Sequence, residues 1–434
     1  MKKIVSAAIV ASVMAGSLFA ADASIKLNAR SHYTPYEKSF VKDNSTTAND
    51  TQKISQFAKS NDAMDIEIKN DYAGAHIGLA LNGGTGTVAV DTKYYGWMNF
   101  GNAKVTAGVF ESVFTKRQNK TINEEGLTDD GNIKNYGLSK ILAITTGAGA
   151  IRASGASFMV DANNIGANCG DRVWSGIFDY TFADVAGGKL LLKAAVVDSV
   201  TDAGASGRNE VTNAYRTDTT DDTRTTVGTG FAFDAALQRE DFSVEGMVRT
   251  SGYYNVATGV YFTASKLIPD TTAVLGFTYG SQSKKNDGTT LAGTTVATAG
   301  WNAYAIDWRF VNNSIDKVTL VLNGKYESLT AKTDDAKAET GLYVVGEIGY
   351  ALSDLIDLGF DAGIYMCDLD DEDKSDKGEN YFQIRPSVGI KAGKGAKITA
   401  ALNYKQLLNT GDIADTSTTA IRTISVPVVF RVKM

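Results

Sequence analysis

The sequence predicts an all-β chain that folds as a closed antiparallel up-and-down transmembrane β-barrel of about 16–20 strands. Three observations support this fold class. Apolar and polar residues alternate with a period of two along most of the chain, the alternating segments are long, and the connections between them alternate between long and short.

The alternation is clearest in the last segment, where the apolar residues from Ile424 to Phe430 share one parity and Ser425 and Arg431 share the other. Period two indicates a strand with one apolar and one polar face. Segments of roughly 10–14 residues exceed the usual length of soluble strands and suffice for a tilted strand to cross the hydrocarbon core. The predicted strands are 24–34, 64–70, 73–82, 86–98, 103–113, 136–146, 149–160, 171–184, 188–200, 223–238, 241–252, 255–266, 270–280, 300–311, 316–328, 340–352, 356–368, 380–391, 396–408 and 420–433.

The connections have two lengths, as expected for short periplasmic turns and long external loops. The long polar ones are 35–63, 114–135, 201–222, 281–299, 329–339, 369–379 and 409–419. The short ones lie near 187 and at 239–241, 266–270, 312–316, 353–357 and 392–396. We expect Pro35 in a loop and Pro269 in a turn, while Pro386 and Pro427 fall inside strands and are assigned to bulges or rim positions.

The N-terminus has the pattern of a secretory signal peptide. Two lysines precede an apolar stretch at 4–19, and small residues follow. Cleavage after Ala20 is favoured and cleavage after Ala23 is the alternative. The chain is therefore divided into a signal peptide, 1–23, and a transmembrane barrel with long external loops, 24–434.

Composition excludes several other classes. A hydrophobic content of 43% excludes intrinsic disorder, and no apolar run of 18 residues follows the N-terminal segment, which excludes a helical membrane protein. A pI near 5.2 argues against nucleic acid as a partner. Two cysteines and two histidines leave little for metal or acid–base chemistry, so the sequence predicts no enzyme activity and no cofactor.

The polar residues that alternate with the apolar ones include charges of both signs, and in a barrel they would face the interior. Charges in a wet lumen set a field and tune ion flow; equally, each of these residues could simply solvate the wall. The predicted lumen-lining residues are Lys93, Lys104, Lys193, Arg249, Asp307, Arg309, Lys325, Glu327, Glu347, Asp361, Arg385 and Lys405.

Two minor sites stay open. Cys169 and Cys367 both map to the external side, where export permits a disulfide, but it would need a loop folded across the mouth. Asp368, Asp370 and Glu372 offer oxygen ligands for a cation, although the glycine of a calcium loop is missing and a solvated acidic loop is the stronger interpretation.

The stretch KYYGWMNFGNAKVTAGVF (93–110), with its aromatic-rich strand, short turn and second strand, resembles outer-membrane barrels of spirochaetes and related bacteria, and the whole mature chain resembles a bacterial outer-membrane porin. The resemblance implies passive diffusion of small hydrophilic solutes and ions through a water-filled lumen, in the bacterial outer membrane. Its implied partners are outer-membrane lipid and those solutes, with a homo-oligomer such as a trimer left open. The sequence departs from the family by ending on Met434 rather than on an aromatic residue.

An alternative from another class is a surface-exposed adhesin or structural outer-membrane protein whose barrel displays the long loops. A substrate-specific channel would differ from a general pore by an ordered constriction. The candidates for that constriction are the loop 114–135 and the glycine-rich region 144–170.

Overall fold

In the computed structural model of the protein, the described residues are 22–41, 50–58, 61–82, 87–109, 175–197, 230–251, 255–282, 301–331, 338–367, 380–393, 395–408 and 420–433. They form strands joined by turns. The strands are β1 (Asp22–Phe40), β2 (Thr51–Ala58), β3 (Asn61–Lys69), β4 (Ala73–Asn82), β5 (Thr87–Phe100), β6 (Ala103–Val109), β7 (Ser175–Val185), β8 (Gly188–Val197), β9 (Gly230–Gln238), β10 (Phe242–Ser251), β11 (Asn255–Ile268), β12 (Thr271–Gln282), β13 (Trp301–Asn312), β14 (Val318–Ala331), β15 (Glu339–Ala351), β16 (Ile356–Cys367), β17 (Tyr381–Lys391), β18 (Ala396–Ala401), β19 (Asn403–Leu407) and β20 (Arg422–Lys433).

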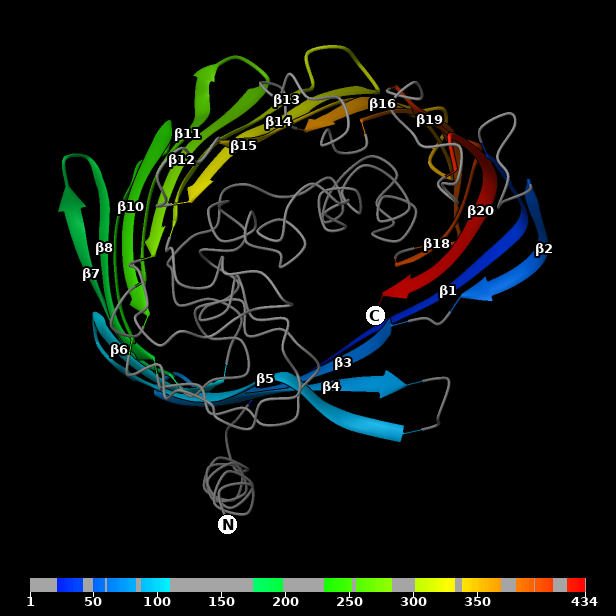
Figure 1. The fold of residues 1–434 in the computed structure, drawn as a ribbon. Helices are drawn as coiled ribbons and strands as arrows, with labels where there is room; N and C mark the ends of the chain where they lie inside the picture. Colours follow the sequence, from blue (N-terminus) through cyan, green and yellow to red (C-terminus); the bar gives the residue numbers. More distant parts are fainter. Residues whose placement is uncertain are drawn as a thin grey trace, which may run out of the picture.

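These strands form one antiparallel sheet that returns to its first strand (Figure 1). β20 pairs with β1 from Asn28↔Lys433 to Phe40↔Arg422, which closes the ring of pairings. β2 and β3 lie end to end along β1 and share one position in the ring. β18 and β19 likewise share one position between β17 and β20. The twenty described strands therefore occupy eighteen positions, within the predicted range of strand numbers.

The two faces of the ring differ as the parity predicts. Large apolar side chains are exposed on the outside, including Phe233 at 56% and Phe430 at 48%. The alternate residues next to them, Asp234 and Arg431, are buried on the opposite face. The protein thus has its apolar surface outside and its charges inside, the reverse of a soluble β-sandwich and the arrangement expected of a barrel in lipid.

The short connections lie where the sequence predicts them. Asp270 and Lys317 have φ of 53° and 60°, in the left-handed region that tight turns require. In the turn between β9 and β10, Arg239 forms an ion pair with Asp241 at 3.1 Å, and Lys266 donates a hydrogen bond to Glu240. That hydrogen bond holds the pKa of the Glu240 carboxyl below its ordinary value.

The structure corrects the prediction for the first long connection. Residues 35–63 were expected to form one polar loop, but β1 continues to Phe40, and β2 and the start of β3 lie inside the interval. Pro35 is therefore in a strand and not in a loop. It stays within the ladder because the register shifts by one residue between Tyr33 and Tyr36, which forms a bulge.

The two strand prolines behave differently. Pro427 lies opposite the β1 bulge, as predicted. Pro386 lies in the middle of β17 with its register unbroken, so its assignment to a bulge or rim position is wrong. Its carbonyl still accepts a hydrogen bond from the Leu402 amide, at 3.0 Å, but proline has no N–H to return. The missing bond coincides with the break between β18 and β19 at Leu402.

Several predictions fall outside the described residues. These are the strands at 136–146 and 149–160, the constriction candidates 114–135 and 144–170, and the signal segment up to residue 21. None of the described residues forms a helix of the length and hydrophobicity that crossing a bilayer requires.

Candidate pore lining

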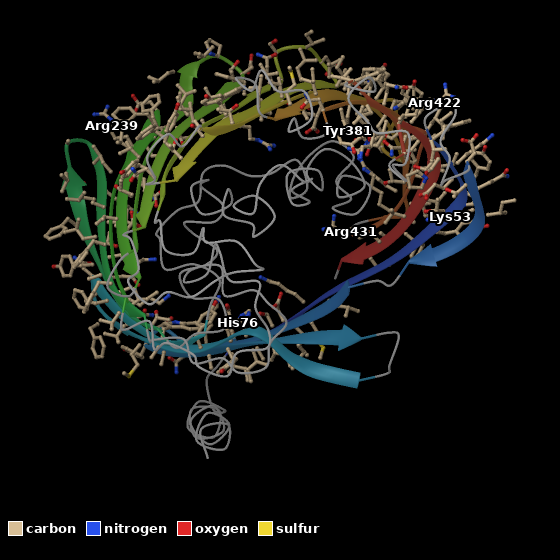
Figure 2. The ribbon with its side chains drawn as sticks, in the orientation of Figure 1. Lys53, His76, Arg239, Tyr381, Arg422 and Arg431 are labelled. Atoms are coloured by element: carbon tan, nitrogen blue, oxygen red, sulfur yellow. The ribbon has the colours of Figure 1, made fainter. Side chains whose placement is uncertain are left out.

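All twelve predicted lumen-lining residues lie in strands of the ring. Arg309, Glu347, Asp361 and Arg385 are buried on the inner face, and Lys104, Lys193 and Lys405 are half-buried. Figure 2 shows side chains that project toward the inside of the ring, where Arg431 is labelled. The side chains of the other five, Lys93, Arg249, Asp307, Lys325 and Glu327, lie outside the described part.

A row of alternating charge crosses the inner face of β6 to β9. Lys104 pairs in register with Asp179, Asp179 with Lys193, and Lys193 with Asp234. The Lys193 ammonium lies 3.4 Å from the Asp179 carboxylate. Cross-strand neighbours of opposite charge attract, so the register holds these side chains against the wall as a neutral strip.

A second row crosses β15 to β17 and is not balanced in the same way. Glu347 lies opposite Asp361, and Asp361 lies opposite Arg385. The Arg385 guanidinium donates to Asp361 Oδ2 through Nε at 3.0 Å and also through Nη2. All three residues are at most 3% exposed. Two adjacent buried acids therefore share this part of the wall with one arginine.

A neutral polar row lies next to it, and the charge pattern of the sequence does not predict it. The Gln383 side-chain amide donates to Asn403 Oδ1, and Asn403 Nδ2 donates to Ser425 Oγ at 3.4 Å. These three residues are buried on β17, β19 and β20. Inward parity was the signal that could have identified them, but parity alone does not show that their strands are adjacent.

Aromatic side chains cover the inner face of β4 and β5. The His76 imidazole stacks on Tyr95 at 5.0 Å, and Tyr95 lies 5.9 Å from Trp97. Gly74, opposite Trp97, allows this because a Cβ there would overlap the indole. The Lys104 ammonium lies 5.0 Å from the Trp97 ring. The inner wall thus combines charged, neutral polar and aromatic sectors.

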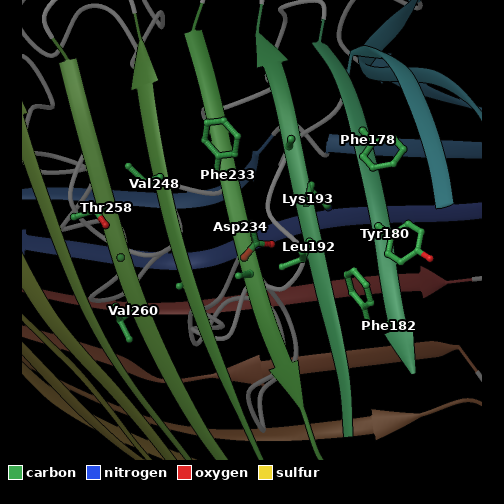
Figure 3. Close-up of a pocket in the computed structure, with 14 residues that line it drawn as sticks. Phe178, Tyr180, Phe182, Leu192, Lys193, Phe233, Asp234, Val248, Thr258 and Val260 are labelled. Atoms are coloured by element: carbon green, nitrogen blue, oxygen red, sulfur yellow. The ribbon is translucent and has the colours of Figure 1, made fainter. Parts of the chain in front are cut away.

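An apolar groove of about 720 Å³ lies on β7 to β11 (Figure 3). Exposed Phe178, Phe233 and Val260 flank it, and Gly246 leaves space in its floor. Since these residues have the outward parity, the groove faces away from the lumen and is no part of the pore lining.

The two minor sites are not tested. Cys169, Asp368, Asp370 and Glu372 lie outside the described residues, and Cys367 ends β16 with its side chain undescribed. Among the residues that the structure describes, no group of three or more histidine, cysteine, aspartate or glutamate side chains could hold a metal ion.

No family model and no curated protein sequence matches the chain. Among solved structures, the anion-selective porin from Comamonas acidovorans aligns with a TM-score of 0.52 and 10% identity, over 95% of this chain and 100% of that chain. The chain has the fold of a bacterial outer-membrane porin. A BenF-like porin from Pseudomonas fluorescens has a TM-score of 0.48 and 10% identity, over 95% and 99% of the two chains. The outer-membrane channel DcaP of Acinetobacter baumannii has a TM-score of 0.46 and 8% identity, over 95% and 97%.

The porin fold confirms the fold class that the alternating pattern predicts. The narrower resemblance to spirochaete barrels at 93–110 stays a prediction.

Proposed function

We propose that the protein is a porin of the bacterial outer membrane, through which small hydrophilic solutes and ions diffuse passively. The observation that carries this proposal is the reversed distribution of side chains in a closed ring of eighteen positions. Barrels of 16–18 strands enclose an aqueous channel, whereas barrels of about eight strands fill their interior with side chains.

The inner wall supports a general pore with weak ion preference. Lysine and aspartate alternate along β6 to β9, and acid outnumbers base in the row from Glu347 to Arg385. Mixed signs oppose the build-up of one strong potential in the lumen. Anion selectivity, the property named for the Comamonas porin, does not follow from these rows.

The test is single-channel recording with the refolded mature chain in planar bilayers. We expect stable conductance steps that grow with salt concentration, from protein whose unheated and boiled forms migrate differently on a gel. A correctly folded barrel that conducts no ions would refute the pore and favour the alternative of a barrel that displays loops. Cross-linking in the same micelles tests whether the chain forms a homo-oligomer.

A further inference from the structure

A cationic pair interrupts the outer surface of the ring where its first and last strands meet. Lys38 and Phe40 on β1 and Arg422 on β20 have the outward parity, because Lys38 pairs with Ile424 and Phe40 with Arg422. The Arg422 guanidinium lies 4.0 Å and the Lys38 ammonium 4.5 Å from the centroid of the Phe40 ring. We call these three residues the rim patch. Figure 2 labels Arg422 at the outer edge of the ring, in contrast to Arg431 inside it.

The rim patch keeps a net positive charge, because one acid accompanies two cations. Lys38 forms an ion pair with Asp50, at 3.9 Å, and the neighbouring Glu37 is 3.3 Å from Lys53. Within the described residues, Arg422 Nε is buried without a hydrogen-bond partner, so an anion outside the wall would have to meet the Nη groups. Holding a guanidinium against a ring leaves its N–H edge for an anion, and phosphate oxygens match that edge in a bidentate manner.

The opposite rim lacks this feature. There Arg239 Nε lies 3.1 Å from Asp241 Oδ1, and Lys266 forms an ion pair with Glu240. Each of these two cations has an acid of its own, so their charges balance. At the rim patch only Lys38 has such a partner, and the described residues supply no ion pair for Arg422. Among these residues, unbalanced positive charge occurs at the rim where β1 ends and β20 begins, which is also the rim of the long connections.

An apolar column continues from the rim patch down the outside of the wall. Ile424, Val426 and Val428 share the parity of Arg422, and Phe430 follows with 48% exposure. Ile54 on β2, in register with Tyr36, is 66% exposed beside it. The Phe382–Tyr404 pair, 5.7 Å apart, lies on the neighbouring strands at the same end. Two cations above an apolar column, flanked by aromatic rings, match the level of lipid headgroups.

We propose that the rim patch binds the phosphate of a phosphorylated membrane lipid, whose acyl chains lie along the column from Ile424 to Phe430. The column is the reason to assign a lipid rather than free phosphate, because a soluble anion gains nothing from an apolar surface beneath the cations. The proposal rests on the membrane location proposed above, but not on conduction through the lumen.

The test is native mass spectrometry of the refolded full-length mature chain in detergent micelles, with diphosphorylated lipid A as the probe. The dephosphorylated form of the same lipid and inorganic phosphate are the comparison ligands. We expect retention of the phosphorylated lipid only, and about tenfold weaker retention in Lys38→Gln/Arg422→Gln, as expected from losing charge-assisted bonds. The matched control is Arg239→Gln/Lys266→Gln at the opposite rim, which should bind like the parent protein.

Equal retention of the two lipid forms, equal retention of inorganic phosphate, or unchanged binding in Lys38→Gln/Arg422→Gln would overturn the proposal. Gel mobility before and after boiling shows whether each variant is folded, and Lys38→Met/Arg422→Met is a second variant if the first does not fold. Conductance measured on the same samples separates failure of the lipid site from failure of the pore.

Discussion

At the scale of single residues, the inner wall contains a buried ion pair beside a second buried acid. Arg385 lies between β16 and β18/β19 and donates two hydrogen bonds to Asp361, which itself lies opposite Glu347. Removing one partner of a buried ion pair is strongly destabilising, and here Asp361 would lose both hydrogen bonds from Arg385 while still lying opposite Glu347.

We therefore expect Arg385→Gln to lower the free energy of unfolding by about 3–5 kcal/mol. Asp361→Asn/Arg385→Gln should recover part of that loss because it also removes an acid. The measurement is the urea midpoint of unfolding in micelles, followed by tryptophan fluorescence. Lys391→Gln is the control: Lys391 is 40% exposed, 2.6 Å from Asp357, and should cost less than about 1 kcal/mol. Equal midpoints for Arg385→Gln and Lys391→Gln would contradict the importance of the buried pair.

The outer wall contains a glycine whose missing side chain matters. Gly324 on β14 lies opposite Trp308, and a Cβ at this position would overlap the indole. We expect Gly324→Ala to displace Trp308 and to destabilise the barrel by about 1–3 kcal/mol, with a change in tryptophan emission. At Gly346, also outward in parity, a Cβ would meet no atom within 4 Å, so Gly346→Ala is the matched control. A normal emission spectrum in Gly324→Ala would argue against this packing.

At the scale of elements, β1 links three parts of the sheet. Its first half pairs with β3, its second half pairs with β2, and its whole length from Asn28 pairs with β20. The closure of the ring therefore depends on the N-terminal strand. Figure 1 shows β1, in blue, beside β20, in red.

This role of β1 bears on the signal peptide. Asp22 and Ala23 pair with Lys69 and Ile68, so cleavage after Ala23 would remove two residues of the ladder. We expect the mature protein to begin at Ala21, because cleavage after Ala20 leaves β1 whole. The intact mass of the protein purified from outer membranes measures this. A mature chain that begins at Ser24 would show that the first two pairs are dispensable.

The connections have a predicted sidedness. The short turns are closed by backbone hydrogen bonds, such as Arg239 N to Phe242 O at 2.8 Å and Ser353 N to Ile356 O at 3.1 Å, whereas the long connections are polar in sequence. Protease added to whole cells should therefore cut the long connections and spare the short turns, since polar exposed loops are cut first. The cut segments should be 201–222, 281–299 and 369–379, and the spared ones 239–241, 312–316 and 353–357. If cysteines placed in the short turns were labelled by a reagent added to intact cells, the predicted sidedness would be reversed.

At the scale of the whole molecule, the field in the lumen depends on the sum of the wall charges. Lys104, Lys193 and Lys405 are half-buried on the inner face, and the Lys405 ammonium lies 3.5 Å from the centre of the Tyr381 ring. Changing all three to glutamine removes positive charge from the wall while leaving the outward face unaltered.

We expect this triple variant to shift the reversal potential toward cation preference in a salt gradient. The shift should be largest near 0.1 M salt and small near 1 M, where the Debye length falls from about 10 Å to about 3 Å. Lys266→Gln, at the rim of the short turns, is the control and should leave the reversal potential unchanged. A triple variant that conducts like the parent at low salt would mean that these lysines do not line the path of the ions.

Most of the described strands, their short turns and the two faces follow from the local sequence pattern, although β2 does not. Period-two alternation assigns each residue a side of the sheet, so the apolar outside and the charged inside could be predicted, as could the turns around Asp270 and Lys317. It could not give the number of positions in the ring, because strand breaks such as the one at Leu402 look like continuous alternation and bulges such as the one at Pro35 look like loops.

Which residues of equal parity meet depends on the tertiary structure. Parity places Arg385 and Asp361 on one face, but their contact depends on the register between β16 and β17. The row from Gln383 to Ser425 and the rim patch depend likewise on strands brought side by side by ring closure, the latter joining Lys38 to Arg422 from opposite ends of the chain. The physical reason is that a face is a local property of one strand, whereas register is set by the pairing of all strands around the ring.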